Sequence, residues 1–119
     1  TAHFGHLPVW SEGNVYLAGA KAWKHEKDGL VDAKSPVTVE LEEKDGQYYL
    51  NTDVYELLNG FADRMIDTDV LGAAFEPEQP FENPDGTKIR FDRDYFGGHR
   101  GVHVLPGPFA NTEDAKKAL

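Results

Sequence analysis

The chain has 119 residues, a mass of 13.3 kDa and a net charge of −9, with 12 Lys and Arg against 21 Asp and Glu. This length is that of one ordinary domain. Because Lys and Arg contacts to phosphates give nucleic-acid binding its affinity, the acidic charge excludes DNA and RNA as expected partners and disfavours an anionic membrane surface.

Further compositional features narrow the class of protein. The chain contains no cysteine, which excludes disulfides, a thiolate nucleophile and a Cys-ligated metal site. No apolar run approaches the roughly 18 residues needed to span a bilayer, so no membrane partner is expected. The chain starts at Thr1 without an initiator Met, which indicates a processing or fragment boundary.

The first 35 residues are expected to form two short strands and a loop. Residues 9–10 and 15–20 alternate aromatic and small side chains without a helical period, and Glu12-Gly13-Asn14 between them has turn chemistry. Residues 21–35 are rich in charged side chains, which predicts an exposed loop.

The middle of the chain carries the strongest local pattern, that of a β-hairpin. Residues 37–42 alternate with period two, residues 43–46 end in Asp45-Gly46, and residues 47–50 form the return strand. Asn51-Thr52-Asp53 then suits the cap of a short helix over residues 54–62. Residues 64–71 predict another strand, which ends at Gly72.

Turn chemistry dominates residues 75–109, where most of the seven prolines lie. These prolines forbid a long helix, and one short strand is expected over residues 88–91. Residues 112–119 begin with a Thr cap and place acids before bases, which predicts a short, frayed helix.

The predicted fold class is therefore mostly β. We expect a single β-rich domain over residues 1–110, a small antiparallel sheet or sandwich-like module with long Pro- and Gly-rich loops and one or two short helices. A short helical tail over residues 111–119 follows it.

Two pairs of carboxylates are candidates for chemistry. Asp67 with Asp69 and Asp92 with Asp94 have the D-x-D spacing that places two acids on one face of a strand. Such a pair suits a shared divalent cation or the acid and base of glycoside hydrolysis. The alternative is that each pair marks a solvated strand end.

Calcium is the one metal that the sequence suggests. Asp85, Asp92 and Asp94, with Asn83 close by, supply the oxygen donors that calcium prefers, and a cation would relieve the repulsion within an acidic loop. The twelve-residue EF-hand pattern is absent, so calcium is a hypothesis with Asp85, Asp92 and Asp94 as its ligands. No other cofactor is expected.

Exposed aromatic rings are the remaining lead. Sugar rings stack on Trp and Tyr faces, while carboxylates and amides bond their hydroxyls. The candidate carbohydrate-binding residues are Trp10, Trp23, Tyr48 and Tyr95. Trp23 carries the most weight because it lies in a polar loop. The alternative is that most of these rings belong to the core.

A large part of the chain resembles a known class of protein. Leu71-Gly72, the run from Pro80 through Asn83-Pro84-Asp85-Gly86 to Gly97, and the closing Pro106-Gly107-Pro108-Phe109 resemble the C-terminal segment of secreted right-handed parallel β-helix proteins of polysaccharide-lyase or glycoside-hydrolase type. Residues 13–21 resemble the last β-helix coil before that segment, and residues 43–46 resemble its hairpin.

The resemblance implies a place beside a catalytic body. Catalytic residues of such enzymes lie on coils that are missing here, so no catalytic residue is assigned. It implies a non-catalytic carbohydrate-associated module, or the terminal part of a polysaccharide-degrading enzyme, secreted or periplasmic, whose partner is polysaccharide or a catalytic β-helix domain. Apolar surface near residues 1–20 is then expected to be exposed or paired with another chain.

Two alternatives come from other functional classes. The first is a small glycosidase or lyase in which Asp67, Asp69, Asp92 and Asp94 act directly. The second is an acidic protein-interaction domain that meets a basic partner.

Overall fold

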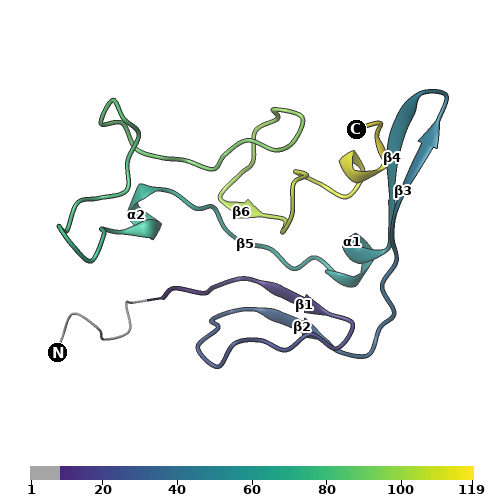
Figure 1. Ribbon diagram of the computed structural model, residues 1–119, viewed down its shortest axis with the longest axis horizontal. Helices are drawn as coiled ribbons and strands as arrows, with labels where there is room; N and C mark the ends of the chain where they lie inside the picture. The colour runs from purple at the N-terminus through teal and green to yellow at the C-terminus, as the bar shows by residue number, and fades with distance from the viewer. Residues whose placement is uncertain (1–8) are drawn as a thin grey trace.

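The computed structural model describes residues 9–119 (Figure 1). The elements in chain order are β1 (Val15–Leu17), β2 (Leu30–Asp32), β3 (Val39–Lys44), β4 (Gln47–Thr52), α1 (Val54–Leu57), β5 (Asp63–Arg64), α2 (Thr68–Leu71), β6 (His103–Val104) and a 3-10 turn, Asp114–Lys116. Within this part of the chain the strands form separate two-stranded sheets, β1–β2, β3–β4 and β5–β6. The prediction of a mostly β module with small antiparallel sheets and short helices is confirmed.

The predicted hairpin is present as β3 and β4. Its register runs from Val39 opposite Thr52 to Lys44 opposite Gln47. Asp45 and Gly46 both have positive φ, 54° and 77°, as a two-residue turn that matches the twist of the strands requires. The hairpin projects from one end of the molecule (Figure 1).

The helix after the hairpin begins where predicted and ends early. α1 spans only Val54–Leu57 because Asn59 and Gly60 take positive φ, 47° and 78°, and turn the chain away from the helix. At its start, the hydroxyl of Thr52 accepts a hydrogen bond from the amide of Val54 at 3.1 Å.

A parallel strand pair lies where the sequence predicted a loop. β2 falls within residues 21–35, so the prediction of a loop is wrong for Leu30–Asp32. The pair has a constant offset of fifteen residues, with Val15 opposite Leu30 and Leu17 opposite Asp32. Residues 9–10 form no strand, and β1 ends at Leu17 because Ala18 and Gly19 turn with positive φ.

The strand predicted over residues 64–71 is also wrong beyond Arg64, which belongs to β5. Thr68–Leu71 is the helix α2, and the Asp67 carboxylate accepts a hydrogen bond from the amide of Val70 at 2.8 Å. The alternation of Ile66-Asp67-Thr68-Asp69 mimics a strand period. Asp67 instead satisfies a free amide at the start of a helix, which an acidic side chain before a helical turn does well.

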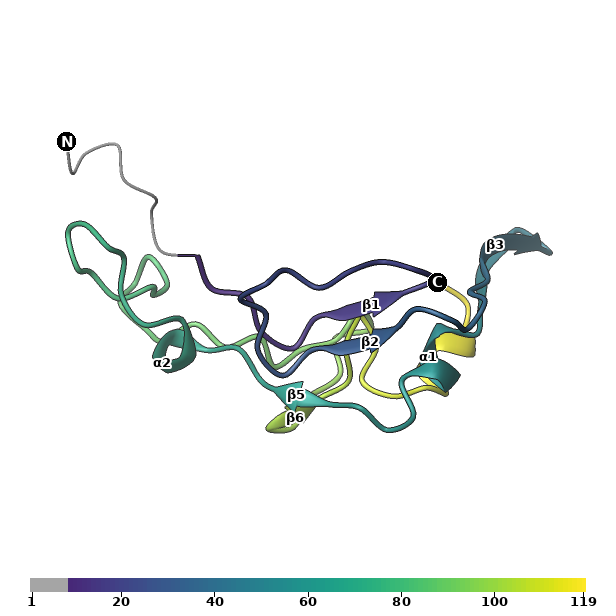
Figure 2. The ribbon, with the colours of Figure 1, turned by 90° about the horizontal axis from the view of Figure 1, so that it is seen from below.

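Turns and single bridges make up the arm between α2 and β6, which loops away from the other strands (Figures 1 and 2). The predicted strand over residues 88–91 does not form; only isolated bridges join Lys88 to Glu82 and Arg90 to Asp67. Thr68 anchors the arm, because its buried hydroxyl donates to the carbonyl of Phe81 at 2.6 Å and accepts from the amide of Ile89 at 2.7 Å.

The core within residues 9–119 is small. Tyr55, Leu58, Phe109 and Ala115 form one buried cluster, and partly buried apolar residues pack around it: Val15, Leu30, Leu50, Phe61 and Leu105. The predicted C-terminal helix is reduced to the 3-10 turn that carries Ala115 into this cluster.

The molecule is extended for its mass. Its radius of gyration is 17.5 Å, against about 13.5 Å for a compact domain of this length. Its accessible surface is 8892 Å², against roughly 6500 Å² expected for a free-standing protein of this mass. Several large apolar side chains are exposed as well, among them Val9, Phe75 and Phe91.

Gly13 offers a test of how the start of β1 packs on β5. A Cβ at Gly13, where φ is 68°, would lie 1.4 Å from a carboxylate oxygen of Asp63, whereas Gly19, with φ of 91°, has open space around it. Gly19→Ala should cost about 1 kcal/mol for the backbone conformation alone. Gly13→Ala should cost about 1–3 kcal/mol more, because Asp63 must move.

Urea unfolding of the two variants measures this difference. Equal losses of unfolding free energy would show that Asp63 does not pack against Gly13.

Candidate functional site

The loop that joins β1 to β2 returns a carboxylate, Glu26, to the start of β1. Ser11 donates its hydroxyl to this carboxylate, the amide of Asn14 donates at 2.9 Å, and the hydroxyl of Tyr16 donates at 3.0 Å. The absence of a side chain at Gly29 makes room for the Glu26 side chain, since a Cβ at Gly29 would lie 2.9 Å from it. The network fixes the parallel pair and keeps a charged carboxylate at its edge.

These donors change the acidity of Glu26. The hydrogen bond from Ser11, with further bonds from Asn14 and Tyr16, outweighs partial burial and lowers the pKa of Glu26 from 4.5 to about 2. Glu26 is therefore ionised at neutral pH and acts as a fixed acceptor.

Trp10 lies beside an ion pair. The guanidinium of Arg64 lies 5.9 Å from the centre of the Trp10 ring and bonds the Glu12 carboxylate at 2.8 Å. Only 11% of the Glu12 side chain is exposed. The arrangement offers an aromatic face next to fixed polar groups, which is the chemistry that a sugar contact needs.

An apolar groove of about 530 Å³ continues from Trp10 toward α2. Its walls include Val9, Trp10, Leu71, Phe75 and Phe81. The exposed Val9 and Trp10 agree with the expectation of open apolar surface near the start of the chain; residues 1–8 of that expectation lie outside the described residues.

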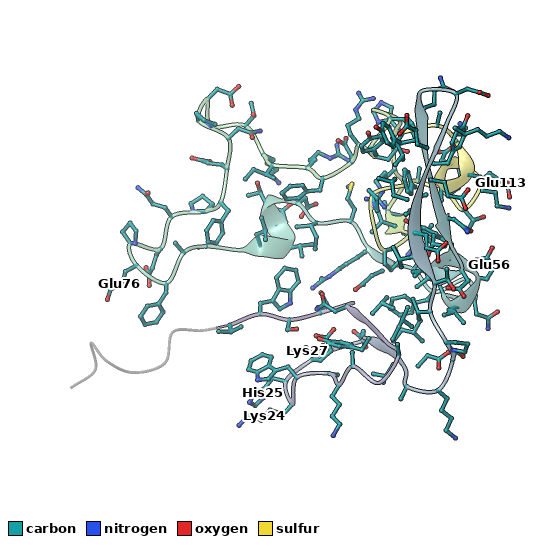
Figure 3. All side chains as sticks on the ribbon, turned by 45° about the vertical axis from the view of Figure 1, so that its right-hand side comes forward. Lys24, His25, Lys27, Glu56, Glu76 and Glu113 are labelled. Atoms are coloured by element: carbon teal, nitrogen blue, oxygen red, sulfur yellow. The ribbon has the colours of Figure 1, made fainter. Side chains whose placement is uncertain are left out.

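Trp23 lies on the projecting loop between β1 and β2. Its side chain is 42% exposed, and the ring of His25 meets it edge-on, with centroids 4.7 Å apart. Lys24 and Lys27 are exposed on the same loop (Figure 3). This loop combines an accessible indole with positive charge on an otherwise acidic protein.

The other two predicted aromatic residues lie elsewhere. Tyr95 is exposed, but its ring packs edge-on against Phe96 and Phe109. Tyr48 is exposed on β4, where its carbonyl accepts a hydrogen bond from the amide of Leu119. None of the aromatic contacts within residues 9–119 joins two of Trp10, Trp23, Tyr48 and Tyr95, so each stays a separate prediction.

The predicted acidic pairs do not share strand faces. Asp67 caps α2, while Asp69 lies within that helix and pairs with Lys88 at 2.9 Å. Asp92 and Asp94 lie outside any strand. The strand geometry expected for paired catalytic carboxylates is therefore absent from these positions.

The proposed calcium ligands are engaged in closing turns. The Asp85 carboxylate accepts hydrogen bonds from the amide and hydroxyl of Thr87, which lower its pKa. Partial burial pulls the pKa of Asp94 upward, but bonds from the amides of Gly98, Ala110 and Phe96 together lower it. Residues 9–119 contain no group of three or more His, Cys, Asp or Glu arranged to hold a metal. Calcium binding by Asp85, Asp92 and Asp94 stays a prediction.

Sequence reasoning missed the Glu26 network and the Arg64 contact to Trp10. Glu26 reaches residues that precede it by ten to fifteen positions, and Arg64 reaches Glu12 across 52 positions. The Glu26 network could have been predicted only from the pairing of two strands fifteen residues apart. The contact of Arg64 with Trp10 has no local sequence pattern that predicts it.

Comparisons with known proteins show what this fold is similar to. No protein-family model and no curated protein matches the chain. Among solved structures, it is similar to XylC in a complex of that protein with xylose, with a TM-score of 0.76 and 24% identity. The likeness shows a shared fold.

The match is very unequal in its coverage. It takes in 87% of this chain and 16% of the XylC chain. The fold described here thus occurs in XylC as a small part of a longer polypeptide. Within residues 9–119, neither helix has the length and apolar character to cross a membrane.

The depressed pKa of Glu26 leads to a pH test. Its hydrogen bonds stabilise the folded state fully above pH 4.5, and that stabilisation should fall as the pH drops from 4.5 toward 2, because the carboxyl must then be protonated. Glu26→Gln should lower the melting temperature at pH 7 and make its decline over this pH interval shallower.

Thermal unfolding of both proteins between pH 7 and 2 measures the effect. The acidic residues elsewhere are unchanged in the variant, so the difference between the two curves reports Glu26. Parallel curves with the same acid slope would contradict the network.

Proposed function

We propose that this chain is a non-catalytic, carbohydrate-associated part of a larger polysaccharide-degrading enzyme, secreted or periplasmic. The observation that carries the proposal is the match to XylC: nearly all of this fold corresponds to one sixth of a longer protein whose structure includes xylose. The aromatic residues exposed on this chain support a role in holding polysaccharide near a catalytic body.

Trp23 is the residue that we propose as the main sugar contact. Its indole is accessible, His25 meets it edge-on, and polar groups that can bond sugar hydroxyls lie on the same loop. Trp10 is the second candidate, with the Arg64–Glu12 pair beside its ring. Binding by such an open surface is expected to be weak, because little of a sugar would be enclosed.

The charge of the loop favours acidic glycans. Lys21, Lys24 and Lys27 are exposed on the loop of Trp23 and outnumber its two acids, Glu26 and Asp28, so a uronic-acid substituent should find a positive partner there although the whole chain carries a net charge of −9. The attraction between exposed charges is screened by salt. We therefore propose substituted, acidic xylan-type polysaccharide as the preferred ligand over its neutral counterpart.

Calorimetric titration with xylose, neutral xylo-oligosaccharides and glucuronic-acid-substituted oligosaccharides tests this proposal. We expect the acidic oligosaccharide to bind most tightly and to lose this advantage at high salt. Trp23→Ala should weaken binding at least about fivefold, which corresponds to about 1 kcal/mol, because the stacking face is lost.

Two variants serve as controls. Trp23→Phe keeps an aromatic face and should retain most of the affinity. Phe91→Ala removes an exposed ring outside the predicted set and should leave binding unchanged. Absence of binding heat with every glycan would overturn the carbohydrate-contacting role.

A further inference from the structure

Asn59 and Gly60 are the two central residues of the tight turn that follows α1. The amide of Phe61 donates to the carbonyl of Leu58 at 2.8 Å, which closes the turn. Both central residues take positive φ, 47° and 78°, as the mirror-image turn types require. Leu58 is only 2% exposed and Phe61 packs against the buried cluster, whereas Asn59 and Gly60 are exposed. The turn therefore presents an Asn-Gly pair to solvent between two residues of the core.

Asn59 differs from the other asparagines of the chain in its hydrogen bonds. Each of the other four side-chain amides is held by a polar neighbour: Asn14 by Glu26, Asn51 by Glu42, Asn83 by Thr87 and Asn111 by Asp114. Within residues 9–119, no hydrogen bond involves the side chain of Asn59, and the amide of Gly60 donates none. The carboxamide of Asn59 and the backbone nitrogen after it are both left accessible.

The following residue also separates Asn59 from the rest. The other four asparagines precede a β-branched residue or proline: Val15, Thr52, Thr112 and Pro84. A β-branched side chain crowds its own amide, and proline has no amide hydrogen. Gly60 has no side chain, and a Cβ built there would meet nothing within 4 Å. The backbone nitrogen of Gly60 can therefore approach the Asn59 carboxamide without steric obstruction.

We propose that Asn59 is a site of spontaneous deamidation. The backbone nitrogen of Gly60 loses its proton to solvent and attacks the side-chain carbonyl carbon, Cγ, of Asn59. The new bond joins that nitrogen to Cγ, the Cγ–Nδ2 bond breaks, and the leaving group takes a proton from water and departs as ammonia. Water then opens the succinimide ring at either carbonyl, which yields aspartate or isoaspartate. Water is the one co-reactant, and no atom is oxidised or reduced.

Isoaspartate changes the turn more than aspartate does. In isoaspartate the backbone runs through the side chain, so one extra carbon separates Leu58 from Phe61. The hydrogen bond that closes the turn is then lost, and the Phe61 ring is displaced from the buried cluster. Aspartate keeps the original backbone path and tolerates positive φ. The modification therefore weakens a small core, and it goes beyond the carbohydrate-associated role, on which it does not depend.

Incubation of the full chain in warm, mildly alkaline buffer, followed by mass spectrometry of its peptides, tests the proposal. The peptide that contains Asn59 should exchange amide for acid at least about tenfold faster than the peptides that contain the other four asparagines, because only glycine leaves the attacking nitrogen uncovered. The rate should rise with pH, since that nitrogen must lose its proton. Enzymatic methylation of isoaspartyl groups then identifies the rearranged product.

Two variants separate the effects of charge and of backbone length. Asn59→Gly is the matched control, because glycine adopts positive φ and carries no carboxamide; its melting temperature should not change during the incubation. Asn59→Asp supplies the new charge on the original backbone. The incubated native sequence should melt at least about 4 °C below fresh Asn59→Asp, by an amount that follows its isoaspartate content.

Each outcome decides the proposal. Rapid conversion at Asn59, with a fall in melting temperature that Asn59→Gly does not show, supports it. An unchanged Asn59 after incubation overturns the site, and equally fast conversion of the other asparagines overturns its selectivity. Conversion to isoaspartate at an unchanged melting temperature overturns the coupling of this turn to the core.

Discussion

The buried cluster of Tyr55, Leu58, Phe109 and Ala115 is the contact on which the rest of the structure depends. It brings α1, just after the hairpin, against the last fifteen residues of the chain, and it receives Val15 and Leu30 from the parallel pair. Apolar burial is the main favourable term in folding. With so few residues fully enclosed, each side chain in this cluster carries an unusual share of the stability.

Hydrogen-bond networks fix the segments that this cluster does not contact. The carboxylate of Glu26 bonds the β1–β2 loop to Ser11, and the hydroxyl of Thr68 bonds both sides of the arm between α2 and β6. The guanidinium of Arg100 donates to the carbonyls of Leu105, Gly107 and Phe109. Fixed hydrogen bonds specify geometry well but contribute little net free energy each. Such a chain keeps its shape with open apolar surface, as a part of a larger body would.

The sequence predicted what local chemistry decides. Asp45-Gly46 with alternating flanks is sufficient for a hairpin, and the start of α1 follows from its neighbours. The parallel pair was missed because the partner of β1 lies fifteen residues away and is only three residues long. At Asp67, the carboxylate caps a helix, although the alternating pattern around it predicts a strand.

The aromatic residues could be recognised as exposed, but their separation over the surface depends on tertiary structure. The Arg64 contact to Trp10 depends on it as well.

We propose that the molecule is one part of a larger enzyme because its core is small, Val9 and Trp10 are exposed, and its fold matches one sixth of XylC. The most direct test is the mass of the native protein that carries this sequence in its source. Light scattering on size-exclusion fractions identified with an antibody to the hairpin should place the sequence in a particle several times heavier than 13.3 kDa. Recovery as a free, monomeric 13.3 kDa chain would contradict the account.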